Sequence, residues 1–179
     1  MRLNISQLFP SLLLLAVSSL SSSIATANDA AQSTGLLEQL NLEQYHGKVV
    51  YVDFWASWCG PCRQSFPVMN DLQETYGEDN FVIIAINEDS EPGAAEQFLN
   101  QYPANFTIFY DQNGELAKYF KVDAMPTSYL LDQAGTAKYR HRGFRQKDVA
   151  KLEQQIETLL SDQSFNAGSS NTSNSGDTE

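Results

Sequence analysis

The two cysteines of the chain, Cys59 and Cys62, both lie in the pentapeptide Trp58-Cys59-Gly60-Pro61-Cys62. Thiols at this spacing can exchange with a disulfide, one attacking as a thiolate and the other resolving the mixed disulfide. A bridge that closes so short a loop constrains the unfolded chain little and is a poor structural staple. We therefore predict a redox-active disulfide that works without a cofactor.

The elements around this pair would set its chemistry. Residues 49–56 are apolar, β-branched and aromatic, which predicts a buried strand, and a helix is expected from about Cys59 to Tyr76. Cys59 would then lie at a helix N-terminus, where free N–H groups and the helix dipole favour a thiolate. Cys62 would lie one turn further in, shielded by the fold.

Asp53 interrupts the apolar strand six residues before Cys59. Side chains alternate along a strand, so Asp53, Trp55 and Ser57 should share one face. A carboxylate buried there would have a raised pKa and could take the proton from Cys62 as that thiol attacks. The alternative is a surface carboxylate at the end of a strand.

The remaining pattern alternates strands with helices and predicts an α/β fold with a mixed central sheet flanked by helices. A proline in the first helix, Pro67, should kink it and divide it in two, and Gly77 should end it. Further strands are expected at 81–87, 106–110, 127–131 and 137–141, and further helices at 92–101, just before Phe120, and at 146–160.

The first residues have the pattern of a secretory signal. Arg2 provides a positive start, residues 12–17 are apolar, and Ala25-Thr26-Ala27 is a small-x-small cleavage site. An uncleaved membrane anchor is the alternative. The predicted organisation is a signal peptide at 1–27, a linker at 28–35, one domain at 36–161 and a disordered Ser/Asn-rich tail at 162–179.

Three sequence features together resemble the thioredoxin superfamily: residues 52–62, Pro67 and Met125-Pro126-Thr127. The export signal and the room for an extra helix and strand at about 90–110 are similar to its TlpA-like group, which includes the DsbE-like cytochrome c maturation reductases. The resemblance implies a cis proline at Pro126. The residues it implies for substrate docking are Trp58, Gly60, Pro61, Met125, Pro126 and Thr127.

The chain also departs from this group. Asp53 stands where many members have Asn. Many members carry an acidic residue after the second strand, where this chain offers Glu88, Asp89 and Glu91. The sequence assigns none of the three a role at the site.

Several functions are consistent with these features. We expect first a periplasmic reductase acting on disulfide- or thiol-bearing exported proteins, with a membrane thiol donor and apocytochrome c as one candidate substrate. A disulfide oxidase or isomerase is the second hypothesis. A copper or zinc delivery protein, using the thiols with His46 or His141, is the third. The net charge of −11 argues against nucleic acid as a partner, and we expect a monomer.

Overall fold

The computed structural model describes residues 38 and 40–162. The predicted signal peptide, the linker and nearly all of the predicted tail lie outside the described residues. Within the described part, a single sheet contains β1 (Val49–Trp55), β2 (Phe81–Asn87), β3 (Thr107–Tyr110), β4 (Thr127–Leu131) and β5 (Ala137–Arg142).

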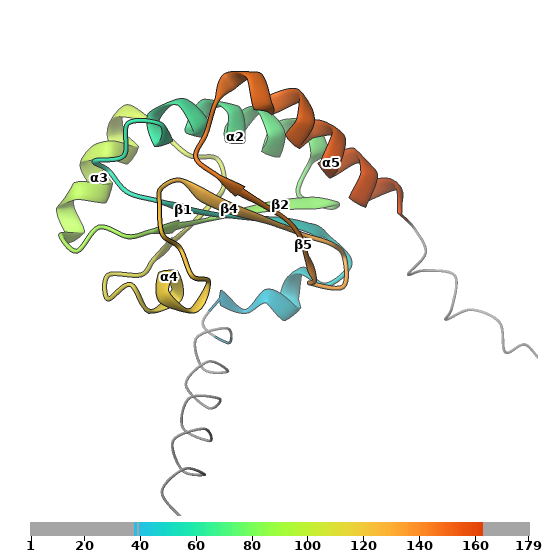
Figure 1. Ribbon diagram of the computed structural model, residues 1–179, viewed down its shortest axis with the longest axis horizontal. Coiled ribbons are helices and arrows are strands. Elements are labelled where there is room, and N and C mark those ends of the chain that lie inside the picture. Colours follow the sequence, from blue (N-terminus) through green and yellow to red (C-terminus); the bar gives the residue numbers. More distant parts are fainter. Residues whose placement is uncertain (1–37, 39, 163–179) are drawn as a thin grey trace, which may run out of the picture.

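Helices cover both faces of this sheet, as Figure 1 shows. Three of them lie on one face and a short helix, α4, lies on the other with the 3-10 helix Leu42–Tyr45. A second 3-10 helix, Gln146–Asp148, leads into the last helix. The helices are α2 (Cys62–Tyr76), α3 (Pro92–Gln101), α4 (Glu115–Tyr119) and α5 (Val149–Ser161).

The strand order is β3-β2-β1-β4-β5. β1 pairs in parallel with β2, and β2 with β3, whereas β4 pairs antiparallel with both β1 and β5. This arrangement confirms the predicted α/β fold with a mixed sheet, and α3 with β3 forms the expected additional helix–strand unit. It also makes β1 the central strand. The segment that follows β1 therefore begins in the middle of the sheet, at the end where the parallel strands have their C-termini.

Burial alternates along β1 between two cores. Val49, Tyr51 and Trp55 pack in the core beneath α2 and α5, which also contains both cysteines. Val52 and Phe54 pack in the opposite core, toward α4. Asp53 has the parity of the first set, so its side chain belongs to the same face as the cysteines.

Two predictions about the first long helix need correction. α2 begins at Cys62 rather than Cys59, because the preceding residues form short turns, with Cys59 N–H donating to the carbonyl of Ala56 at 3.1 Å. Pro67 lies inside one continuous helix and does not divide it. A proline removes a single N–H donor, and the helix continues through that gap. The predicted stop at Gly77 is confirmed, with φ of 69°.

Candidate active site

The two cysteines form a disulfide at the start of α2, with the sulfur atoms 2.04 Å apart. The backbone N–H of Cys62 points at the Sγ of Cys59, with 3.2 Å between nitrogen and sulfur. A donor in this position would also stabilise a negative charge on that sulfur after reduction. The geometry therefore favours Cys59 as the thiolate, as the sequence predicts.

The surface around the disulfide is unevenly exposed. Cys62 is fully buried, and Cys59 is only 3% exposed in this oxidised form. Trp58 is 67% exposed, and Gly60 and Pro61 are exposed as well. An approaching protein would therefore meet the Trp58 ring and the Gly60-Pro61 turn before it reached either sulfur atom.

Asp53 lies under this site, and its side chain is 1% exposed. Its Oδ2 has no hydrogen-bond partner among the described residues. Burial raises the pKa of the Asp53 carboxyl well above its usual value of 3.8. The predicted burial and raised pKa are confirmed, and the alternative of a surface carboxylate is wrong.

Tyr51 and Ser128 lie next to this acid. Asp53 is opposite Ser128 in the β1–β4 pairing, and the Tyr51 hydroxyl donates to Ser128 Oγ at 2.8 Å. Burial raises the pKa of Tyr51, and the negative charge of Asp53 raises it further. Tyr51 therefore remains a neutral hydrogen-bond donor beside the acid.

The loop before β4 and the first residue of that strand carry the remaining predicted docking residues. The Met125–Pro126 peptide bond is cis, as the resemblance implied. Pro126 and Thr127 are buried, and half-buried Met125 packs against the core cluster that contains both cysteines. The N–H of Gly143, just after β5, donates to the Pro126 carbonyl at 2.7 Å. Met125 thus packs against the same core to which the cysteine pair belongs.

The acids after β2 have separate surroundings. Asp89 is 4% exposed, and its carboxylate accepts hydrogen bonds from the backbone N–H and hydroxyl of Ser57, two residues before Cys59. Asn87 Nδ2 also donates to Asp89, at 2.8 Å. Glu91 is exposed and precedes α3 without making a side-chain cap. The sequence offered these acids without indicating that Asp89 supports the cysteine loop.

Glu88 forms a carboxyl pair with Asp111. Burial, together with the charge and hydrogen bonding of Asp111, raises the pKa of Glu88 to about 8. Asp111 in turn accepts the backbone N–H groups of Glu115 and Ala117 at the start of α4, at 3.0 and 2.9 Å. The Glu88 N–H donates to the carbonyl of Trp55 at 2.9 Å. The pair therefore connects the end of β1 with α4.

Trp55 itself belongs to the packing beneath the site. Its ring contacts those of Phe66 and Phe98, with centroids 4.7 and 4.8 Å away. Its Nε1 is buried without a hydrogen-bond partner in the described structure. This tryptophan fills the core, in contrast to its exposed neighbour Trp58.

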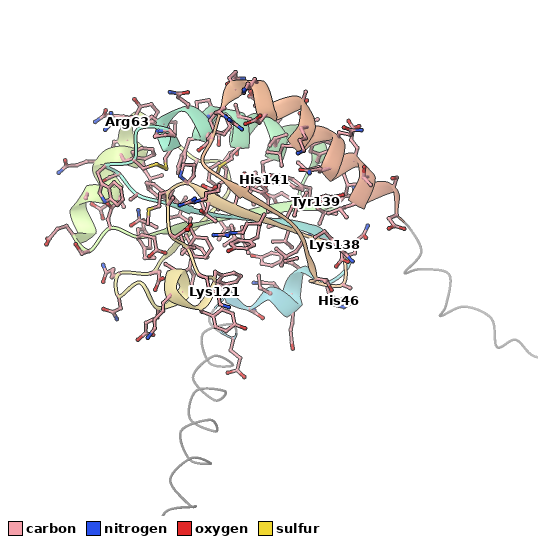
Figure 2. All side chains as sticks on the ribbon, viewed as in Figure 1. His46, Arg63, Lys121, Lys138, Tyr139 and His141 are labelled. Atoms are coloured by element: carbon pink, nitrogen blue, oxygen red, sulfur yellow. A yellow bond between two sulfur atoms is a disulfide. The ribbon has the colours of Figure 1, made fainter. Side chains whose placement is uncertain are left out.

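Residues 38 and 40–162 contain no group of three or more His, Cys, Asp or Glu side chains placed to hold a metal ion. His141 Nε2 lies 2.7 Å from Gln155 Oε1, and Figure 2 shows His46 at the opposite end of the molecule from Arg63 on α2. No helix in this range is long and apolar enough to cross a membrane.

The disulfide lies at the start of the helix that follows the central strand, and a buried acid lies beneath it. This arrangement defines the class of thioredoxin-fold thiol–disulfide oxidoreductases. Comparison with known proteins then supplies the family. The Redoxin family model matches residues 23–156, and the chain belongs to this family.

Individual relatives agree with this assignment. The chain is 33% identical over 122 residues to "Thiol-disulfide oxidoreductase ResA" of Bacillus thuringiensis subsp. konkukian, a match covering 68% of this chain and 69% of that protein. It is 36% identical to "Thioredoxin-like protein YneN" of Bacillus subtilis, covering 67% and 70%. Within the thioredoxin superfamily these similarities make it a TlpA/DsbE-like protein.

A solved structure gives the same result. The crystal structure titled as a putative thiol:disulfide interchange protein DsbE from Chlorobium tepidum is 49% identical. It superposes with a TM-score of 0.65, covering 66% of this chain and 84% of that one. The fold class and the enzyme class predicted from the sequence are therefore confirmed.

Proposed function

We propose that this oxidoreductase works as a reductase of exported proteins, with Cys59 as nucleophile and Cys62 as resolving thiol. The observation that carries the proposal is the Cys62 N–H directed at Cys59 Sγ, which distinguishes the two sulfur atoms. The Gly60-Pro61 dipeptide adds support, because no basic residue within the motif stabilises the thiolate further.

The reaction would start from the reduced pair. The Cys59 thiolate attacks one sulfur of a substrate disulfide, forms a mixed disulfide and releases the other substrate sulfur as a thiolate, which takes a proton from water. The Asp53 carboxylate then takes the Cys62 proton, and the Cys62 thiolate attacks Cys59. The second substrate sulfur leaves as a thiolate that takes a proton from water or from the protonated Asp53, and the Cys59–Cys62 disulfide remains.

Substrate docking is proposed for two segments. Trp58, Gly60 and Pro61 offer the exposed surface at the disulfide, and Trp58 provides a large apolar contact. The proline loop, with Met125, Pro126 and Thr127, would hold the backbone of an extended substrate. These assignments rest on position and exposure.

The setting of the reaction follows from the first residues. We propose that the signal-like segment 1–27 exports the protein to the periplasm, where a membrane thiol donor would restore the reduced pair. Apocytochrome c is one candidate substrate, supported by the similarity to the Chlorobium tepidum protein titled DsbE. We further propose that the enzyme acts as a monomer and binds no nucleic acid.

The reduction potential of the Cys59–Cys62 couple tests the direction of electron flow. It can be measured by equilibrating the protein with a dithiol buffer and quantifying the two redox forms. A value near that of thioredoxin, about −270 mV, would support a reductase. A value near that of DsbA, about −120 mV, would reject this proposal in favour of an oxidase.

A further inference from the structure

A buried acid that changes its protonation state needs a route for the proton. In the proposed reaction Asp53 takes a proton from Cys62, and it must lose that proton before it can act again. The Asp53 side chain is only 1% exposed, and its Oδ2 has no hydrogen-bond partner among the described residues. When the departing substrate thiolate takes its proton from water, Asp53 must pass its own proton to solvent through neighbouring groups.

A row of polar side chains crosses the sheet from Asp53. Asp53 of β1 is opposite Ser128 of β4, and Ser128 is opposite His141 of β5. Residues directly opposite in antiparallel strands point to the same face, with Cβ atoms about 4.5–5.5 Å apart. Over such spacings a hydroxyl can pass a proton directly or through one water. The row therefore leads from the buried acid to the half-buried His141 on the last strand of the sheet.

This row lies on the face of the sheet that α5 covers. His141 Nε2 is 2.7 Å from Oε1 of Gln155, a residue of α5, and Tyr139 packs against the core that contains both cysteines. Figure 2 shows His141 and Tyr139 on β5, below α5 in this view. Arg140, between them, lies over the Tyr129 ring on the opposite face.

The hydroxyl of Ser128 is arranged to pass a proton on. The Tyr51 hydroxyl donates to Ser128 Oγ at 2.8 Å, and both side chains are buried. This bond uses one lone pair of Ser128 and leaves the second lone pair and the hydroxyl proton for other partners. Asp53 and His141 lie on either side of it in the row. Ser128 can therefore accept a proton from one neighbour while it gives its own to the other.

His141 is the residue at which this row meets solvent. It lines a hollow of about 230 Å³ together with Tyr51 and the start of α5. With Gln155 Oε1 as acceptor, Nε2 of the neutral ring carries the proton and Nδ1 is left as a base. An imidazole readily gains and loses a proton near neutral pH. The charged residues in the same lining are Arg140, Arg142, Arg145, Asp148 and Lys151.

A histidine bonded to a helix can simply hold β5 against α5, and the contact with Gln155 serves that purpose. It does not explain why the interior between His141 and Asp53 is polar. Burying the hydroxyls of Ser128 and Tyr51 costs free energy that apolar side chains would avoid. A route for protons accounts for both the histidine and the buried hydroxyls.

We propose that His141, acting through Ser128, carries protons between Asp53 and the solvent in this hollow. In the outward direction Asp53 gives its proton to Ser128 Oγ as the Ser128 hydroxyl gives its own to His141 Nδ1. The imidazolium then releases a proton to water, so Asp53 becomes a carboxylate and only O–H and N–H bonds change. This inference rests on the proposed function, since that reaction makes Asp53 change its protonation state.

Proton exchange at Asp53 can be measured on the oxidised full chain in dilute buffer. The probe is the carbon-13 NMR signal of its side-chain carboxyl, identified by its absence from the spectrum of Asp53→Asn. Across a pH titration the wild type should give one averaged resonance. In His141→Ala the exchange rate near the midpoint should fall at least about tenfold, seen as broadening or as two separate resonances. Added imidazole should restore averaging, which a merely structural role of His141 would not produce.

His46→Ala provides the matched control, because it removes the other histidine of the chain, which is exposed and does not line the hollow. It should leave the averaged resonance unchanged. Ser128→Ala should slow exchange as well, and imidazole should not restore it, because the link to Asp53 is then missing. Averaging in His141→Ala as sharp as in wild type, or equal slowing in His46→Ala, would overturn the proposal.

Two further results separate this inference from the proposed function. Separate resonances for the two forms of Asp53 in the wild type would overturn the proton route, because exchange would then be slow even with His141 present. Failure of the reduced wild-type protein to reduce a small neutral disulfide, hydroxyethyl disulfide, would instead reject the proposed reductase. The NMR titration stays informative in that case, because it involves no cysteine chemistry.

Discussion

The carboxylate of Asp89 holds Ser57 at two points, accepting its backbone N–H at 3.0 Å and its hydroxyl at 2.9 Å. Ser57 is the residue before Trp58, and β1 ends at Trp55. The short connection from the central strand to Cys59 is therefore fixed by an acid from the end of the next strand. Asn87, the last residue of β2, binds the same acid.

Asp89→Asn should destabilise the protein because it replaces one carboxylate oxygen with an NH₂ group that cannot accept from Ser57. We expect a loss of about 1–3 kcal/mol in the free energy of unfolding, measured by urea titration of the oxidised form. Ser57→Ala removes only the hydroxyl and should cost less. If the two losses added fully in the double variant, the direct Asp89–Ser57 interaction would be excluded.

Asp53→Asn should stabilise the oxidised protein at alkaline pH. The pKa of Asp53 is raised in the fold, so the native state holds a proton that the unfolded chain releases above pH 3.8. Stability therefore falls as pH rises above that value, by up to about 1.4 kcal/mol per pH unit, until the native carboxyl ionises. Urea titrations at pH 4 and pH 8 should show a gain for the variant at pH 8 alone. Asp71→Asn, at an exposed position of α2, is the control and should show no such gain.

The same Asp53→Asn change should slow the resolving step. Without the carboxylate, the Cys62 proton has no buried acceptor, and we expect a rate lower by up to about 10²-fold near neutral pH. Stopped-flow measurement of substrate thiol release would give this rate as a function of pH. An unchanged pH–rate profile would remove Asp53 from the mechanism while leaving its effect on stability intact.

Glu88→Gln should change how stability depends on pH over a defined window. The pKa of Glu88 is raised from 4.5 to about 8, so wild-type stability should decline as pH rises from about 4.5 to about 8. The glutamine variant should lack that part of the decline, which thermal unfolding across this range would detect. Exposed Glu96 provides the matched control as Glu96→Gln. A wild-type slope in Glu88→Gln would contradict the prediction.

The two cysteine variants should behave differently. Cys59→Ser removes the nucleophile and should reduce disulfide reduction to background. Cys62→Ser retains the nucleophile without the resolving thiol and should accumulate mixed disulfides with substrate, which non-reducing gels and mass spectrometry would detect. Mixed disulfides in Cys59→Ser, and none in Cys62→Ser, would reverse the two roles.

Much of the fold was predictable from local patterns. The bounds of β2, α3 and β4 agree with the prediction, because apolar runs and a proline at the first turn mark them clearly. The start of α2 was misplaced because Pro61 already has helical backbone angles, φ −62° and ψ −26°, although the regular helix begins only at Cys62. Local sequence does not distinguish that turn from a first helical turn.

The cysteine pair and Asp53 were predictable because they lie on one strand–turn–helix segment. The Asp89–Ser57 and Glu88–Asp111 contacts were not, because they depend on β1, β2 and β3 lying side by side with a particular register. The same is true of the hollow lined by Tyr51, the end of β5 and the start of α5, which forms only when α5 folds back over the sheet. Sequence spacing identifies residues that act within one segment, whereas residues contributed by separate segments need the tertiary structure.

The raised pKa values of Asp53 and Glu88 also affect what happens when the chain unfolds. The formal net charge of −11 counts both carboxyls as ionised, yet near pH 7 the folded protein holds Glu88, whose pKa is raised to about 8, mainly in the protonated form. Unfolding near pH 7 must therefore release protons to the surrounding buffer. The heat of unfolding should consequently depend on the ionisation enthalpy of that buffer, so phosphate and Tris should give different calorimetric values for the same transition.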